Sequence, residues 1–196
     1  MAAKRGATGQ LHEDRQPAKR HKKTPSGLLA DRTASPATVT VLSAVAAGHP
    51  STAARAVQGA LSRDEATTLV DWAAGQGFAF GWGSDDPHAA RRKDYRSANT
   101  VEVDDAALAA RLWQRLRDAL PATVHVNECG DPSSVGEWRA VGLHPRLLFV
   151  EYRDGGHFSP HADGFLVAGP HERSLCTVLM YLNDVESGGA RPYKLP

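Results

Sequence analysis

The chain has 196 residues, enough for one medium-sized domain together with a tail. A formal net charge of +1 excludes a strong overall electrostatic bias, and two cysteines are too few for a disulfide scaffold. The longest apolar run, Val39 to Ala47, is about half of the ~20 residues that a membrane span needs. It also follows a long polar leader, which differs from a secretory signal. We therefore expect a protein of the cytoplasm or nucleus that is neither secreted nor inserted in a membrane.

Residues 1–38 are rich in Lys, Arg, Ala, Ser, Thr and Pro and have very few large apolar side chains. Such a segment cannot bury enough surface to offset its ordering entropy, so we expect a disordered basic tail at 1–38 and a linker at 39–59. Two basic clusters, Lys4-Arg5 and Lys19 to Lys23, resemble a bipartite nuclear-import signal, although a solvated tail has the same composition. The tail has no interleaved aromatic residues, and the remaining sequence is not basic, so nucleic acid is not an expected partner.

Two helices are predicted in the first part of the domain. The first begins at Ser62-Arg63-Asp64-Glu65, a capping box, and ends before the glycines of 75–77. Its apolar residues recur at helical spacing: Ala66, Leu69, Val70 and Ala73. The second is capped by Asp104 or Asp105 and ends before Pro121. Its buried side is expected to carry Leu108, Leu112, Trp113 and Leu116. Polar stretches at 81–92 and 127–137 are predicted loops.

Three extended segments follow the helices, at 147–152, 157–163 and 175–182. The last one is apolar enough to be buried on both faces of a sheet. Gly155-Gly156 and Gly188-Gly189 punctuate these segments. Helices followed by strands indicate the α+β class, in which the helices support one side of a sheet.

His161-Ala162-Asp163 is the main candidate for a chemical site. On an extended strand, alternate side chains share a face, so this imidazole and this carboxylate can reach one metal ion together. They would be two of the three ligands in a 2-His-1-carboxylate triad, which holds Fe(II) and leaves one face open. His12-Glu13-Asp14 in the tail has the same spacing without a strand around it, so the context of the tripeptide decides.

That context has a recognisable order of residues. It runs Arg146-x5-Tyr152-x2-Gly155-x2-Phe158-x2-His161-x-Asp163, then Ser174-x2-Thr177-x3-Tyr181-Leu182-Asn183, then Gly188-Gly189. In order and spacing it resembles the prolyl 4-hydroxylase branch of the 2-oxoglutarate- and iron-dependent dioxygenases. Residues 138–189 carry the match, and residues 60–121 match more loosely, through a capped helix, Arg96-Ser97 and a helix that ends in Leu-Pro.

The resemblance implies a double-stranded β-helix (jelly roll) and hydroxylation of a prolyl or other protein side chain, with a protein or peptide as substrate. By position, His161 and Asp163 would bind Fe(II). Three further residues would line the pocket for 2-oxoglutarate: Tyr152, Thr177 and Tyr181. The tyrosine hydroxyls would lie near the distal carboxylate of this cosubstrate, and ascorbate is the family's usual reductant. Tyrosines on strands also commonly pack in a core with the hydroxyl in water, so that alternative stays open.

The sequence departs from the family after Gly188-Gly189. The family has a second His ligand and then a Lys or Arg further along, whereas this sequence stops at Pro196, seven residues after Gly189. We therefore expect 60–196 to be a C-terminally incomplete dioxygenase domain. The alternative is a truncated, non-catalytic remnant or binding module. His157 shares strand parity with His161 but is expected to be a surface residue, and Cys176 a small core residue.

Overall fold

The computed structural model describes residues 29, 38–43, 54–80, 94–126, 132–161, 163–164, 166–169 and 171–184. The helices are α1 (Arg63–Gln76) and α3 (Ala106–Leu116), with short 3-10 turns at Arg117–Ala119 and Pro132–Ser134. The first strands are β1 (Thr38–Ser43), β2 (Ala54–Gln58), β3 (Ala79–Phe80), β4 (Arg96–Ser97), β5 (Asn99–Asp104) and β6 (Thr123–Val126). The later strands are β7 (Gly136–Arg139), β8 (Arg146–Glu151), β9 (His157–Phe158), β10 (Val167–Gly169) and β11 (Glu172–Arg173).

Both helices begin where the sequence predicts. The Ser62 hydroxyl accepts a hydrogen bond from the Glu65 N–H at 3.2 Å, and the Ser62 N–H donates to the Glu65 carboxylate at 2.9 Å, which completes the capping box. Helix α1 ends at Gly77, whose φ of +83° suits a residue without a Cβ. Asp105 caps α3 by accepting from the Leu108 N–H at 2.8 Å.

The central sheet has the strand order β3-β5-β8, and neighbouring strands are antiparallel. Strand β8 confirms the prediction of a strand near 147–152, whereas β5, its partner, was not predicted. The register runs from Asn99 opposite Glu151 to Asp104 opposite Arg146. Residues of β5 alternate in burial, with Val101 and Val103 in the core, as expected for a strand with one covered face.

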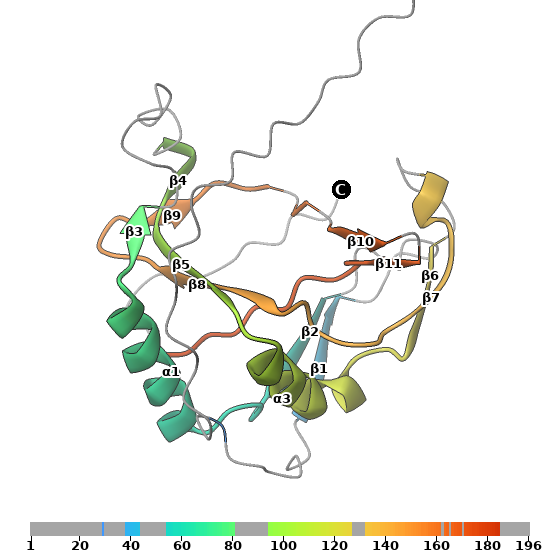
Figure 1. Ribbon diagram of the computed structural model, residues 1–196, viewed down its shortest axis with the longest axis horizontal. Coiled ribbons are helices and arrows are strands. Elements are labelled where there is room, and N and C mark those ends of the chain that lie inside the picture. Colours follow the sequence, from blue (N-terminus) through green and yellow to red (C-terminus); the bar gives the residue numbers. More distant parts are fainter. Residues whose placement is uncertain are drawn as a thin grey trace, which may run out of the picture.

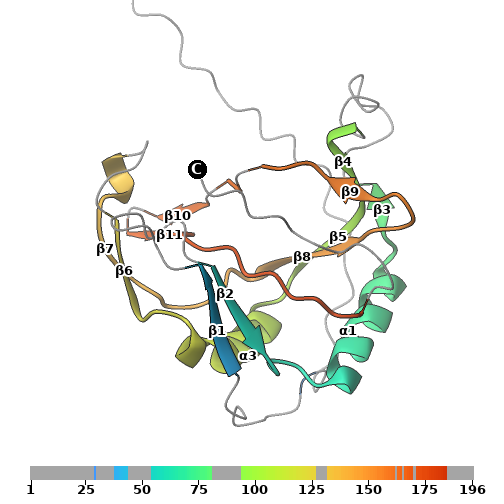
Figure 2. The same ribbon diagram turned by 180° about the vertical axis from the view of Figure 1, so that it is seen from behind.

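The core lies between this sheet and the helices. One cluster of buried leucines comes from α1, α3 and the N-terminal part of the chain: Leu29, Leu69, Leu108 and Leu112. Leu147 and Phe149 of β8 pack against them, as do Met180 and Leu182. Figures 1 and 2 show the helices on one side of β5 and β8 and the stretch from β9 to β10 on the other. The mixture of helices and small antiparallel sheets confirms the α+β class.

The predicted strand at 175–182 is not formed. These residues are described, but no strand is assigned to them. Their burial still alternates: Val178, Met180 and Leu182 are partly buried, and the residues between them are exposed. Only one face is therefore covered, and the expectation of burial on both faces is wrong. Cys176 is exposed rather than in the core, because the partly buried face formed by Val178, Met180 and Leu182 does not extend to it.

The described parts of the N-terminal region contain more structure than their composition predicts. Strands β1 and β2 pair antiparallel inside the segment that we expected to be a linker. Leu29, in the predicted disordered tail, is 1% exposed and belongs to the core. Apart from residues 29 and 38, the tail lies outside the described residues, as does the predicted loop at 81–92. The loop predicted at 127–137 is partly wrong, because β7 already begins at Gly136.

Candidate functional site

A glycine turn brings β9 back across the molecule after β8. Gly155 has a φ of +73°, a conformation that favours glycine. A Cβ on Gly156 would lie 2.7 Å from the Arg153 carbonyl oxygen and 3.0 Å from that of Ser97. The turn places β9 antiparallel to β4, with Arg96 opposite Phe158. A further backbone hydrogen bond, from the Ser159 N–H to the Tyr95 carbonyl at 2.8 Å, extends this pairing towards His161.

His161 and Asp163 converge, as the spacing of their side chains predicts. The His161 Nε2 and Asp163 Oδ1 atoms are 3.2 Å apart, and the His161 side chain is 14% exposed against 45% for Asp163. The backbone differs from the prediction, however, because β9 ends at Phe158 and both residues lie in irregular structure. The expected strand at 157–163 is thus limited to its first two residues.

The second nitrogen of His161 is fixed by the backbone. Nδ1 lies 2.7 Å from the Ser159 carbonyl oxygen, which can only accept a hydrogen bond, so Nδ1 carries the proton. In a neutral ring, Nε2 then presents a lone pair to the Asp163 carboxylate. A proton or a metal ion between these two atoms would be held by both of them.

The geometry of the pair fits a first-row metal ion. Two ligands that bind at about 2.1 Å and at right angles are roughly 3 Å apart, close to the 3.2 Å found here. An imidazole whose other nitrogen donates to a carbonyl is also the common arrangement for a histidine ligand. Within the described residues, no group of three or more His, Cys, Asp or Glu side chains could hold a metal ion. Among the described residues, His161 and Asp163 are thus a pair of candidate donors without a third beside them.

An aromatic cluster surrounds the His161 ring. The Phe158 ring stacks on it, with centroids 3.6 Å apart and planes inclined by 20°. Tyr95 meets both rings edge-on, at 5.4 Å from Phe158 and 6.3 Å from His161. The Arg96 guanidinium lies 4.8 Å from the Phe158 centroid. Sequence reasoning missed Tyr95, although it directly precedes the Arg96-Ser97 pair that carries part of the family resemblance.

His157 is a surface residue, as expected. Its Nε2 lies 2.9 Å from the Asp94 carbonyl oxygen and its Nδ1 lies 3.3 Å from that of Gly155. Both contacts favour the doubly protonated ring and raise the pKa of His157, with Asp94 as the larger cause. Since both nitrogens face backbone oxygens, neither is available to the His161–Asp163 pair.

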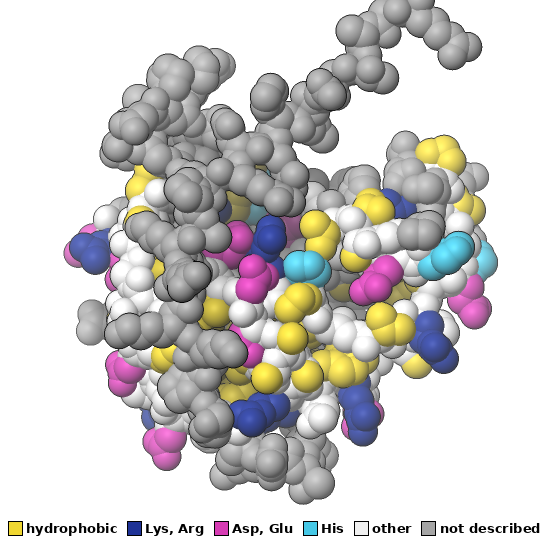
Figure 3. All heavy atoms as spheres, in the orientation of Figure 1, with side chains coloured by type: hydrophobic (Ala, Val, Ile, Leu, Met, Phe, Trp, Pro, Cys, Tyr) yellow, Lys and Arg dark blue, Asp and Glu magenta, His cyan; other side chains and the backbone are white. Residues whose placement is uncertain are grey.

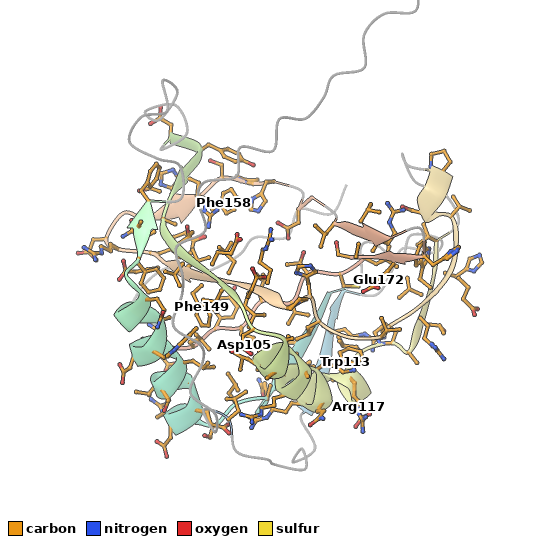
Figure 4. All side chains as sticks on the ribbon, viewed as in Figure 1. Asp105, Trp113, Arg117, Phe149, Phe158 and Glu172 are labelled. Carbon is orange, nitrogen blue, oxygen red and sulfur yellow. The ribbon has the colours of Figure 1, made fainter. Side chains whose placement is uncertain are left out.

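The three residues proposed for cosubstrate binding all lie at the surface. Tyr152 follows β8 in phase with the exposed Leu148 and Val150, and it is 46% exposed. Tyr152 therefore lies on the face of β8 opposite to Phe149, and Figure 4 shows Phe149 on the α1 side of the strand.

Thr177 and Tyr181 lie on the exposed side of the 174–182 stretch, with Tyr181 69% exposed. Figure 3 shows the surface from the side of Figure 1, where apolar side chains occupy much of the middle of the described face. The role of the three residues in a pocket stays a prediction.

Comparison with protein-family models, curated proteins and solved structures gave no match for this chain. Among the described residues, neither helix combines the length and the apolar character that crossing a bilayer requires.

Proposed function

We propose that this chain is an Fe(II)- and 2-oxoglutarate-dependent dioxygenase of the prolyl 4-hydroxylase type, built on a double-stranded β-helix. Its substrate would be a prolyl or other side chain of a protein or peptide. The observation that carries the proposal is the His161–Asp163 pair, with Nε2 3.2 Å from the carboxylate and Nδ1 held by a backbone carbonyl. An ordered pair of this kind, in the sequence context of the resemblance, suits an iron site better than a solvated ion pair.

His161 Nε2 and the Asp163 carboxylate would hold the metal ion. The hydrogen bond from Nδ1 to Ser159 keeps the ring in the tautomer whose Nε2 lone pair is free to bind. When bound, Fe(II) would supply the oxidative chemistry: O2 is the oxidant, 2-oxoglutarate is converted to succinate and CO2, and one oxygen atom enters the succinate while the other hydroxylates a substrate C–H bond. Ascorbate is the expected reductant.

The proposed cosubstrate residues provide hydroxyl donors on the side of β8 away from the helices and on the neighbouring stretch. Tyr152, Thr177 and Tyr181 can each donate one hydrogen bond to a carboxylate. A carboxylate that leaves water needs such donors, because an unpaired buried charge costs several kcal/mol. Leu148 and Val150, exposed beside Tyr152, offer apolar surface to a peptide.

The test compares metal binding and turnover in four proteins: the unmodified chain, His161→Ala, Asp163→Ala and His144→Ala. His144 is an exposed histidine whose Nδ1 accepts from the Arg146 N–H, so its variant controls for the loss of a histidine elsewhere. We expect His161→Ala and Asp163→Ala to weaken Fe(II) binding by more than the roughly 10–100-fold that loss of an outer partner costs. His144→Ala should bind Fe(II) as the unmodified chain does. Fe(II) affinity is the deciding measurement, because the described residues offer two of the three expected ligands and the unmodified chain is expected to form little or no succinate.

Two outcomes would contradict the proposal. Fe(II) affinity that both ligand variants leave unchanged would place the metal elsewhere. An unmodified chain that binds neither Fe(II) nor 2-oxoglutarate would favour the alternative of a non-catalytic binding module.

A further inference from the structure

The His161 ring lies beyond the end of β9, where no strand ladder holds it. Among the described residues, its polar contacts are the 3.2 Å approach of Nε2 to Asp163 and the 2.7 Å hydrogen bond from Nδ1 to Ser159. One hydrogen bond fixes the direction of one ring atom, but it leaves the plane of the ring free to turn about that bond. The contact of Nε2 with Asp163 is a weak second constraint, because that side chain is 45% exposed, so a further contact is needed to hold the plane of the ring.

We propose that Phe158 is a positioning residue for His161: its stacked ring fixes the imidazole plane, and thereby aims Nε2 at the point shared with Asp163. The two rings are 3.6 Å apart at 20°, a close and nearly parallel contact. Stacking resists tilting of the plane, and the hydrogen bond resists rotation within it. Together they define the direction of Nε2. The metal-binding consequence of this inference rests on the proposed function, whereas the orientation of the ring does not.

Phe158 is itself held from a second strand, which makes it a suitable support. It pairs with Arg96 in the β4–β9 ladder, and the hydrogen bond from Ser159 to Tyr95 continues that ladder. The Tyr95 ring meets the Phe158 ring at 5.4 Å with an angle of 88° between planes, the edge-to-face arrangement that aromatic pairs prefer. A ring that is fixed in this way can transmit its orientation to His161.

The competing explanation is that Phe158 only adds apolar packing. Phe149 provides a matched control for this explanation, because it also makes an edge-on aromatic contact, with Trp72 at 5.6 Å. Figure 4 places Phe149 near α1 and Phe158 on β9, on opposite sides of the sheet. Replacing Phe149 by Leu removes the same group from the chain without touching His161.

The experiment uses the unmodified chain, Phe158→Leu, Phe158→Tyr and Phe149→Leu. The first measurement is NMR of the His161 ring without metal, with its signals assigned from their loss in His161→Gln. In the unmodified chain, the ring protons should be shifted upfield by the Phe158 ring current, and the nitrogen shifts should show the proton on Nδ1. Phe158→Leu should abolish the upfield shift and mix the two tautomers. Phe158→Tyr, which keeps a ring, should restore both signatures, and Phe149→Leu should leave both unchanged.

The second measurement is Co(II) affinity in the same four proteins. We expect Phe158→Leu to weaken Co(II) binding about 10–100-fold, the usual effect of losing a group that orients a ligand, and the other two variants to stay within a few-fold of the unmodified chain.

The results separate the inference from the proposed function. Absence of the upfield shift in the unmodified chain overturns the inference even if Phe158→Leu fails to fold. So does unchanged Co(II) affinity in a folded Phe158→Leu. If the NMR signatures follow the prediction but the unmodified chain binds no Co(II), Phe158 does orient His161 and the proposed function fails.

Discussion

Glu65 is a buried carboxylate with two sets of partners. Arg115 donates to it twice, with both distances 2.8 Å, and the Ser62 N–H donates to it at 2.9 Å. Arg115 also donates to the Ala60 carbonyl oxygen at 3.2 Å, so both charged groups are well supplied with hydrogen bonds. The hydrogen bonds from Arg115, and to a lesser degree those from Ser62, hold the pKa of Glu65 at about 2, against an ordinary value of 4.5.

This pKa predicts a loss of stability in acid. A carboxyl group with a lowered pKa in the folded state stabilises the protein above its unfolded-state pKa of about 4.5, and the contribution disappears as pH falls towards 2. At 1.36 kcal/mol per pKa unit, the full contribution is on the order of 3 kcal/mol. Urea unfolding between pH 4.5 and pH 2 measures this loss. Glu65→Gln should remove most of the decrease in unfolding free energy that the Glu65 carboxylate causes over this range.

The control for this prediction is Glu102→Gln. Glu102 forms an ion pair with Arg146 at 3.2 Å in which both side chains are about half exposed, so its loss should cost under about 1 kcal/mol. If the unfolding free energies of Glu65→Gln and Glu102→Gln fell equally with pH, the buried Glu65–Arg115 pair would not be the cause of the acid instability.

At the scale of elements, the turn between β8 and β9 is the connection on which the site depends. Gly156→Ala would place a methyl group 2.7 Å from the Arg153 carbonyl oxygen, so the backbone must move. We expect a cost of about 1–3 kcal/mol, as for other overpacked positions. The amide of Ser159, which bonds to Tyr95, should also exchange its hydrogen faster.

Gly142→Ala is the matched control, because a Cβ at that exposed position meets nothing within 4 Å. It should leave both stability and the exchange of the Ser159 amide nearly unchanged. If both alanine variants changed stability and Ser159 amide exchange equally, the close packing around Gly156 would not be what requires a glycine in this turn.

The elements that could be predicted from the sequence are those with local signals. Ser62 and Asp105 mark helix starts through contacts within a few residues, and the structure has those starts. The end of α1 was predicted two residues too early, because the helix continues through Gly75 to Gln76. Strand β8 could be predicted because it is a continuous apolar run. Strand β5 was missed, since its pairing depends on residues about 50 positions away. For the 175–182 stretch, an apolar composition predicted a buried strand, but a strand also requires a neighbour to pair with.

For the candidate site too, one local contact could be predicted from the sequence and contacts between distant segments could not. The spacing of His161 and Asp163 correctly indicated that their side chains meet. It could not indicate that Ser159 fixes Nδ1 outside a regular strand, or that Tyr95 reaches the cluster through the pairing of β4 with β9. The Ser159 contact is local but depends on the chain leaving the strand after Phe158, and the Tyr95 contact joins β4 to β9, which are far apart in the sequence.

At the scale of the whole molecule, Leu29 links the N-terminal part of the chain to the core. It is 1% exposed, it packs with Leu69, Leu108 and Leu112, and its carbonyl accepts from Arg111 at 3.5 Å. Leu29→Ala should therefore lower the free energy of unfolding by about 2–5 kcal/mol, as expected for a buried leucine. Urea unfolding measures this directly.

Leu166→Ala serves as the comparison, because Leu166 is 41% exposed and its loss should stay within about 0.5 kcal/mol. A negligible effect of Leu29→Ala would mean that the N-terminal leucine does not occupy the core in solution.

The arrangement around Glu65 also has a consequence for how the molecule opens. Helix ends usually fray one by one, at little cost and independently of each other. Here one carboxylate joins the first turn of α1, the last turn of α3 and, through Arg115, the backbone just after β2. None of these three segments can open without exposing the partners of the other two. They should therefore open as one cooperative unit, whose free energy approaches that of global unfolding.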